Sequence, residues 1–370
     1  MKHPLLVFST LCGLACATEE PAAPTGDPWH LGPGLGLVLT SSQTYETGSL
    51  DLFQAAAPND SRHDTVLAAG DAALRLLTHG ALILDRGIPG NVTLLDDALA
   101  VVAQVALPDC GPHDAVPLPD GRLLISCYET ALMAILDPAS ERLSAGPDLS
   151  RFADADGNPE MDRMLLANDR IYVTLQLLDR RTYASSGLAQ IAVLDASTLT
   201  LVDARPNAIG LQGLELPLAN PYTGITLLGD GRLAVGCAGD WSYPASIGVA
   251  AVDPASGAAS ILYGGRALGG PPISMSAAPD GRLHALISFP DGMLPTEMRL
   301  VRLDSGAATT LYRASGFNLA GLAFDAAGNV FIGNRSPDSS AGLWRIDAAT
   351  GSTAGPFATG LLPVEIEIAR

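Results

Sequence analysis

Pro119-Asp120-Gly121-Arg122-Leu123, followed by Ile135-Leu136-Asp137-Pro138-Ala139-Ser140, is the part of the sequence that decides the fold. A tight Asp-Gly turn leads to a short apolar run, and a second apolar run ends in Asp and a turn of small residues. The pattern returns at residues 229–233 with 251–257, at 279–283 with 302–306, and in weaker form at 168–171 with 193–197 and at 327–330 with 345–351. A repeat of about fifty residues built in this way is typical of a β-propeller, in which small sheets stand around an axis.

Each repeat is expected to form one blade, a four-stranded antiparallel sheet with strand A beside the channel and strand D outside. The Asp-Gly turn suits the hairpin between strands A and B, because glycine accepts a positive φ without steric cost. On this template blades 3 to 7 cover about residues 109–150, 159–207, 219–264, 270–313 and 317–359. Strands expected at 71–77, 81–84 and 91–96 make blade 2.

The first blade is expected to be completed by the end of the chain. Residues 35–70 supply strands B, C and D but contain no strand A. The segment Pro363-Val364-Glu365-Ile366-Glu367-Ile368 alternates with period two and has no strand B after it. We therefore predict an all-β, seven-bladed β-propeller over residues 34–370, with the C-terminal strand closing blade 1. Six or eight blades are the alternatives.

The beginning of the chain has the composition of a targeting segment. Lys2 supplies a positive charge, residues 5–11 are apolar, and Gly13-Leu14-Ala15-Cys16 places small residues before a cysteine. This ending resembles the lipobox of bacterial lipoproteins, in which the cysteine is lipidated. We predict a lipoprotein-type signal peptide at 1–16 with Cys16 as the lipidation site, and a flexible tether at 17–33. The chain would then be anchored by lipid in the cell envelope, at the outer membrane or the periplasmic face. An ordinary secretory leader is the alternative.

Composition narrows the classes of function. The formal net charge of −18 argues against nucleic acid and against direct contact with an anionic membrane, because both require a basic patch. The single lysine is Lys2, which excludes lysine Schiff-base and P-loop chemistry from the mature chain. The sequence has no Gly-x-Ser-x-Gly, His-Glu-x-x-His or Cys-x-x-Cys motif. We expect a monomer that touches a membrane only through its N-terminal lipid.

Three cysteines follow the leader: Cys110, Cys127 and Cys237. Cys127 and Cys237 take equivalent positions on two non-adjacent blades and should not meet. Cys110 and Cys127 flank one predicted hairpin, where a disulfide is an option in an exported protein. Ideal strand register sets these two about four residues out of line. We therefore favour small, buried, unreactive thiols.

Three segments between about residues 70 and 200 carry a family resemblance: Asp85-Arg86-Gly87 with Gly90-Asn91-Val92, residues 148–161, and residues 175–180. In these segments the chain resembles bacterial exported β-propellers of the YVTN type, and more closely a set of uncharacterised propeller lipoproteins. The resemblance implies the fold and export. It implies no reaction, so no catalytic residue is carried over from it.

Three aspartates are candidates for a site at the mouth of the channel. Asp114 and Asp162 lie seven residues before the turn glycine of their blades, or its equivalent, and Asp71 takes the same place in blade 2. The corresponding residues of blades 5, 6 and 7 are Gly224, Ser274 and Gly321. Carboxylates that converge where strands A begin would suit Ca²⁺. Each aspartate could instead cap its own loop through backbone N–H groups, which we favour, or the three could line a polar ligand pocket.

A second acidic segment, Asp154-Ala155-Asp156-Gly157, resembles part of an EF-hand loop. The first and twelfth ligand positions of such a loop would be Phe152 and Arg163, where oxygen ligands are required. The segment therefore fails as an EF-hand. An irregular Ca²⁺ site that uses Glu160 is left open, and an acidic connection between blades 3 and 4 is the favoured interpretation.

The long loops of blades 4 and 5 are candidates for a recognition surface. Loops after strands B and D lie on one rim of a propeller, and aromatic and arginine side chains there favour partner binding. The candidate partner-binding residues are Arg180, Tyr183, Tyr222, Trp241 and Tyr243. Simple elaboration of the loops is the alternative.

The leading hypothesis is an envelope-anchored propeller that acts as a binding or scaffold module for a protein, peptide or glycan. The alternative is a hydrolase or lactonase that depends on a Ca²⁺-type metal at the central channel, motivated by Asp71, Asp114 and Asp162. That mechanism also needs a Glu and an Asn at set positions, which we cannot place. A redox propeller with a quinone cofactor is the least favoured class, and no cofactor is assigned beyond possible Ca²⁺.

Overall fold

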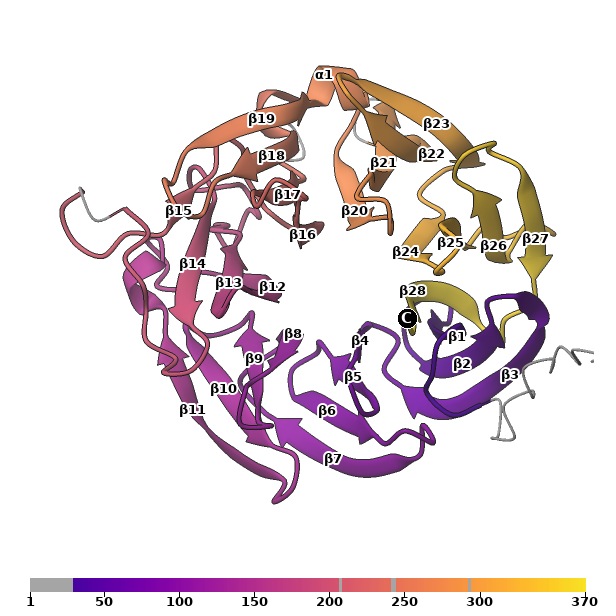
Figure 1. Cartoon of the computed structure of the whole chain (residues 1–370), viewed down its shortest axis with the longest axis horizontal. Coiled ribbons are helices and arrows are strands. Elements are labelled where there is room, and N and C mark those ends of the chain that lie inside the picture. The colour runs from indigo at the N-terminus through magenta and orange to yellow at the C-terminus, as the bar shows by residue number, and fades with distance from the viewer. Residues whose placement is uncertain (1–28, 206–207, 241–243, 292–293) are drawn as a thin grey trace, which may run out of the picture.

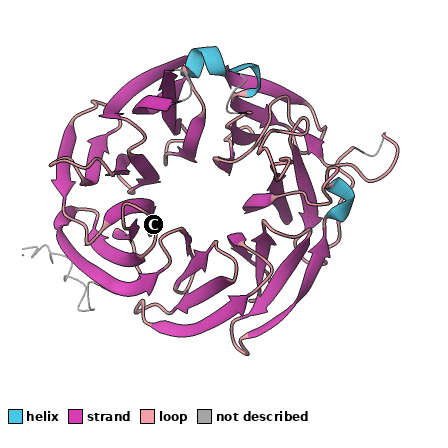
Figure 2. Ribbon diagram, turned by 180° about the vertical axis from the view of Figure 1, so that it is seen from behind, coloured by secondary structure: helices cyan, strands magenta, loops and turns pink. Residues whose placement is uncertain are grey.

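Seven four-stranded sheets stand in a ring around a central channel, so the predicted seven-bladed β-propeller is confirmed (Figure 1). The computed structural model describes residues 29–205, 208–240, 244–291 and 294–370. Seen from behind, the ring consists almost entirely of strands and connecting loops (Figure 2). The innermost strands carry the channel wall, and the outermost strands form the outer surface of the ring.

The first four blades contain, from the channel outward, β28 (Leu362–Ile368), β1 (Leu35–Ser41), β2 (Gly48–Gln54) and β3 (Ala57–Ala68) in blade 1; β4 (Ala72–Leu76), β5 (Ala81–Asp85), β6 (Gly90–Leu95) and β7 (Val101–Leu107) in blade 2; β8 (Pro112–Pro117), β9 (Leu123–Cys127), β10 (Leu132–Asp137) and β11 (Arg142–Asp148) in blade 3; and β12 (Met161–Ala167), β13 (Arg170–Leu175), β14 (Gln190–Asp195) and β15 (Leu214–Glu215) in blade 4.

The last three blades contain β16 (Gly224–Leu227), β17 (Leu233–Cys237), β18 (Gly248–Val252) and β19 (Ala259–Gly264) in blade 5; β20 (Pro272–Ala277), β21 (Leu283–Asp291), β22 (Leu294–Asp304) and β23 (Ala307–Ser315) in blade 6; and β24 (Leu319–Phe324), β25 (Asn329–Asn334), β26 (Gly342–Asp347) and β27 (Thr353–Phe357) in blade 7. The helical segments are α1 (Gly265–Leu268) and the 3-10 turns Ser150–Phe152 and Pro244–Ser246.

The end of the chain closes the ring as predicted. β28 pairs antiparallel with β1, with Leu39 opposite Glu365 and Gly36 opposite Ile368. β28 is thereby strand A of blade 1, while β1, β2 and β3 are its strands B, C and D.

The Asp-Gly turns form the hairpins between strands A and B. Gly121 has φ +85° with no neighbouring atom to limit it, and Gly231 and Gly281 adopt the same conformation. The Asp120 carboxylate accepts hydrogen bonds from the backbone N–H and the guanidinium of Arg122. The turns at Gly231 and Gly281 have the same contacts. The repeated Asp-Gly motif therefore stabilises the turn between strands A and B through local hydrogen bonds.

The apolar runs pack between neighbouring sheets. The largest buried cluster joins blades 2, 3 and 4 through side chains such as Leu84, Leu124 and Ile171, each fully shielded from solvent. Burial on both faces is expected where each blade is sandwiched between two others. The described part of the chain contains no helix long and apolar enough to cross a membrane.

Blade 4 departs from the predicted layout at its outer strand. Leu201 bridges to Leu194, which starts this strand, but the regular pairing resumes only at β15. The chain between them leaves the sheet as an excursion at the outer edge, stabilised where Asp203 accepts the N–H of Gln212. Blade 4 therefore ends with β15 at Glu215, beyond the expected boundary, and the residues between β15 and β16 connect blades 4 and 5.

Cys110 and Cys127 form a disulfide, in contrast to the favoured expectation of two thiols. The hairpin ladder places Pro112 opposite Cys127 and continues through hydrogen bonds from Tyr128 N–H to Gly111 and from Glu129 N–H to Cys110. A register shift within this pairing brings the two sulfurs together, where ideal pairing predicted a larger offset. Cys237 is a buried free thiol, and burial raises its pKa.

Candidate binding site in the central channel

A cavity of about 820 Å³ occupies the channel and is lined by residues from all seven blades. Its volume lies within the range of sites for small ligands, roughly 300–1,000 Å³. Loops after strands B and D supply Tyr45, Arg86, Tyr222 and Phe317, so the cavity reaches the rim that carries those loops, while Arg370, after strand A of blade 1, lines it toward the other rim. The innermost strands supply the deeper wall.

Arg75 on β4 is the centre of an ion-pair network that joins three blades. Its Nε donates to Asp114 on β8, and its Nη1 donates to Glu365 on β28 at 2.9 Å. The same carboxylates satisfy backbone groups of the next blade: Glu365 accepts the N–H of Leu74 at 2.8 Å, and Asp114 accepts that of Met164 at 2.8 Å. Arg75, Asp114 and Glu365 therefore hold the exposed inner edges of neighbouring sheets together.

Electrostatics within this network favour the ionised forms. Burial opposes the charge on Glu365, but Arg75 and Arg163 outweigh it and lower the pKa of this carboxyl. Burial likewise opposes the charge on Arg75, while Asp114 and Glu365 raise its pKa well above the usual range. Both groups remain charged at neutral pH, as a buried pair must be when each partner compensates the other.

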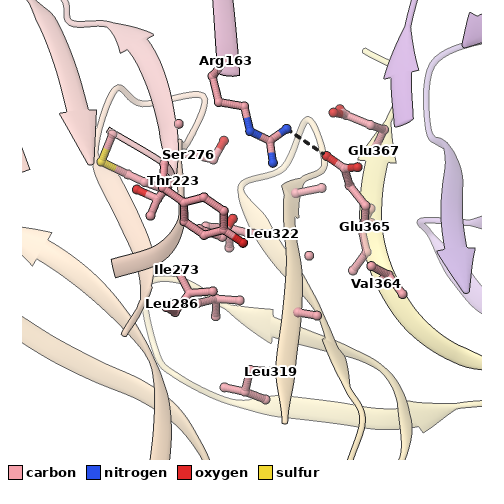
Figure 3. A pocket seen from close by; sticks show the side chains of 18 of the residues that line it. Arg163, Thr223, Ile273, Ser276, Leu286, Leu319, Leu322, Val364, Glu365 and Glu367 are labelled. Atoms are coloured by element: carbon pink, nitrogen blue, oxygen red, sulfur yellow. Dashed lines mark hydrogen bonds and ion pairs between the residues drawn. The ribbon is translucent and has the colours of Figure 1, made fainter. Parts of the chain in front are cut away.

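Arg163 on β12 reaches into the cavity with most of its donors unengaged (Figure 3). Its Nη1 lies 3.5 Å from Glu365 across the channel, and its Nε lies 3.8 Å from Asp162. The Nε atom is buried and has no hydrogen-bond acceptor. Two contacts at such lengths leave a planar guanidinium with five N–H groups largely available.

Arg86, at the end of β5, is a second guanidinium in the cavity wall. It pairs with Asp71, whose side chain is 60 % exposed, and its own Nε is buried without an acceptor. Tyr222 lies in the electrostatic field of both arginines. Burial raises the pKa of this phenol, while Arg86 and Arg163 act against the increase.

The wall opposite these arginines is apolar. Ile273, Leu286, Leu319 and Leu322 come from blades 6 and 7 and lie together at one side of the cavity (Figure 3). Ser274 and Ser276 are the polar side chains that β20 adds to this wall. The cavity is therefore amphipathic, with most of its charged side chains from blades 1 to 4, one further cation, Arg335, from blade 7, and apolar side chains mainly from blades 6 and 7.

Glu367 is the least compensated carboxyl in the channel. It alternates with Glu365 on β28, and its nearest cation, Arg75, is 3.9 Å away. Burial raises the pKa of Glu367 to about 7, against the lowering effect of Arg75. Because its side chain is 35 % exposed, solvent screens part of this effect.

The three predicted calcium ligands each have their own partners. Asp114 binds Arg75, and Asp71 binds Arg86. Asp162 pairs with His113 at 3.1 Å and accepts a hydrogen bond from Gln176, and it does not line the cavity. Within the described ranges, no group of three or more His, Cys, Asp or Glu side chains is placed to hold a metal ion. Calcium at this arc stays a prediction.

The residues predicted for partner binding fall in different places. Arg180 pairs with Glu129, and Tyr183 is 63 % exposed; both line a small cavity of about 30 Å³ in the loop-bearing rim. Tyr222 belongs to the channel wall. Trp241, Tyr243 and the predicted lipidation site Cys16 lie outside the described residues.

The acidic segment before β12 packs against the loop that follows β13. Asp156 accepts the N–H of Arg180, and Glu160 accepts that of Leu178. Burial raises the pKa of Glu160 to about 8. Arg163, the expected twelfth EF-hand position, points into the channel, away from such a loop.

Sequence reasoning missed Arg75, Arg86, Arg163, Glu365 and Glu367 as site residues. A signal was present in the last strand, because period-two alternation puts Glu365 and Glu367 on one face of β28. No local signal joins Arg75 to Glu365, which are 290 residues apart.

Comparison with known proteins supports the fold. No family model matches the chain, and no curated protein sequence matches it. A 6-phosphogluconolactonase-like protein from Bacteroides fragilis superimposes with a TM-score of 0.59 at 13% identity, covering 94% of this chain and 100% of that chain. Hydrazine synthase of Kuenenia stuttgartiensis gives 0.54 at 15% identity (95% and 93% covered), and streptogramin B lyase gives 0.52 at 11% identity (83% and 93% covered). At these identities the likeness shows the propeller fold alone.

Proposed function

We propose that this chain is an envelope-anchored binding propeller, which receives a protein, peptide or glycan at the loop-bearing rim and holds part of it in the channel. The observation that carries the proposal is the cavity of about 820 Å³, which has charged and apolar walls and reaches this rim. Pockets of this size with a few convergent polar groups are the usual sites of ligand recognition. The lipid anchor at Cys16 remains part of the proposal.

A binding role fits the state of Asp114 and Glu365 better than catalysis does. Asp114 and Glu365 each have both oxygens engaged by arginine or backbone N–H groups. A general base must be free to accept a proton from its substrate. The metal-dependent hydrolase remains the alternative prediction, and thermal unfolding in calcium and in EDTA tests it.

The test is binding of the full chain to peptide arrays and glycan arrays. We expect at least one class of probe to bind and the binding to weaken about tenfold or more in Arg163→Gln or Tyr183→Ala, because a lost charged or aromatic contact at a binding hot spot costs at least that much. Arg232→Gln is the matched control, since Arg232 belongs to an Asp-Gly turn on the opposite rim. Binding that neither channel nor rim variant changes would contradict the proposal.

A further inference from the structure

Three hydrogen-bond donors in the cavity wall lack an acceptor in the protein. They are Nε of Arg86, Nε of Arg163 and Oγ1 of Thr223, all buried. Buried donors without partners are rare in folded proteins, and all three side chains belong to the lining of one cavity, so a molecule bound there is a source of the missing acceptors. The donors belong to blades 2, 4 and 5.

The charge of that molecule follows from the neighbouring groups. Two guanidinium groups are matched in geometry to the two oxygens of a carboxylate or to a phosphate. The cavity is lined by five arginines and four carboxyl groups, an excess of one positive charge that matches a singly charged carboxylate better than a doubly charged phosphate; they are Arg75, Arg86, Arg163, Arg335 and Arg370, and Asp71, Asp114, Glu365 and Glu367. The wall therefore favours a carboxylate.

The body of the molecule follows from the opposite wall. Ile273 is partly exposed in this wall, and Phe317, which also lines the cavity, is 49 % exposed, so these two side chains offer apolar surface to whatever the arginines hold. Covering that surface with an apolar group removes it from water, which favours binding.

We infer that the central cavity binds an organic carboxylate with an apolar body, with its carboxylate between Arg86 and Arg163 and its body against blades 6 and 7. A peptide C-terminus that ends in an apolar residue and a fatty acid both have this chemistry, and a volume of about 820 Å³ accommodates a short peptide end. The inference deepens the proposed function and rests on the channel being its binding site.

The experiment is calorimetric titration of the full chain with matched pairs of probes. One pair is N-acetyl-Ala-Ala-Ala-Leu as the free acid and as the C-terminal amide, and the other is octanoate and octanol. We expect at least one acid to bind about tenfold or more tightly than its neutral partner, because a charge-assisted hydrogen bond contributes that much. The pair that shows this preference identifies the source of the carboxylate.

Arg163→Gln should abolish the preference for the acid, and Arg163→Lys should restore part of it, which separates a binding role from a loss of folding. Arg232→Gln should leave the preference intact. Equal binding of acid and neutral probe, an acid preference that survives in folded Arg163→Gln, or no binding of any acid would overturn the inference. The proposed function would outlast such a result if array binding still depends on Tyr183, and it would fail with the inference if array binding depends on neither residue.

Discussion

The two halves of the channel wall join neighbouring blades by different means. In the charged half, side chains bridge the inner strands: Glu365 accepts the N–H of Leu74, and Asp114 accepts that of Met164. In the apolar half, backbones meet directly, since Met275 N–H donates to the carbonyl of Thr223 at 3.1 Å. Where glycine stands in place of aspartate, direct contact between the two backbones replaces the bridge made by a charged side chain.

The glycines of the apolar half make this approach feasible. Gly224 occupies the position that holds Asp114 in blade 3, has φ +143°, and a Cβ there would lie 2.8 Å from the Met275 carbonyl oxygen. Gly321 in blade 7 is similarly close to Ile366 of β28. The repeat therefore specifies the ring, and the residue at one position in each blade decides whether neighbouring inner strands are joined by a charged side chain or by direct backbone contact.

The largest effect is expected from breaking the charged half. Glu365→Ala should lower the free energy of unfolding by about 3–5 kcal/mol, because it leaves a buried Arg75 and the Leu74 N–H without their acceptor. Urea denaturation measures this. Glu367→Ala is the control and should cost less than about 1 kcal/mol, since its nearest cation is 3.9 Å away. Equal costs for the two variants would show that Glu365 does not bridge the blades.

The next effect is expected from breaking the apolar half. Gly224→Ala should destabilise the protein by about 1–3 kcal/mol, because the new methyl group would collide with Met275 and the backbone conformation disfavours a side chain. Gly229→Ala is the matched control, because a Cβ at Gly229 meets no atom within 4 Å. Thermal unfolding of both variants measures the difference in their stability. A neutral Gly224→Ala would mean that close approach is not what joins blades 5 and 6.

A smaller effect is expected in the pH dependence of the free energy of unfolding, which should differ between variants in the charged half and the apolar half of the channel wall. Glu367 has a pKa of about 7 in the folded protein against an ordinary value of 4.5, so the folded state holds its proton over that interval. The free energy of unfolding should therefore fall as pH rises from about 4.5 to about 7. Glu367→Gln should remove about 1 kcal/mol of that fall, after allowance for solvent screening of the partly exposed side chain.

Denaturation of wild type and Glu367→Gln at pH 5 and pH 8 measures the difference. Parallel pH profiles for the two proteins would place the pKa of Glu367 near its ordinary value. Ser276→Ala, in the apolar half, should follow the wild-type profile.

The smallest effect is expected from calcium. Asp71, Asp114 and Asp162 already have cationic or amide partners, so we expect the thermal midpoint to be the same in calcium and in EDTA. A ligand present at a thousand times its dissociation constant would stabilise by roughly 4 kcal/mol, which is readily seen. A rise that Asp114→Ala removes would instead assign a metal site to the arc and favour the hydrolase.

Local sequence signals were enough to predict the ring. Asp-Gly turns and period-two strands act within a few residues, which is why the blade order and the closing strand β28 follow from the sequence. Asp71 and Asp114, which were expected near the channel, line its cavity, whereas Asp162 is not among the lining residues. The ion pairs of the channel could not be predicted from the sequence, because the contact between Arg75 and Glu365 depends on how the seven blades close into a ring. Tyr222 and the excursion after Leu201 belong to loops, whose conformation has no simple sequence rule.

The pairing of β28 with β1 also orders events during synthesis. The ribosome completes β1 to β27 before β28, so Arg75 and Arg163 exist in the growing chain before their counter-ion Glu365. Ring closure and neutralisation of the channel are thus a single late step. A chain that stops before β28 lacks strand A of blade 1, and its Arg75 keeps Asp114 but lacks Glu365. A closed ring is therefore obtained only from chains whose translation has passed through this strand.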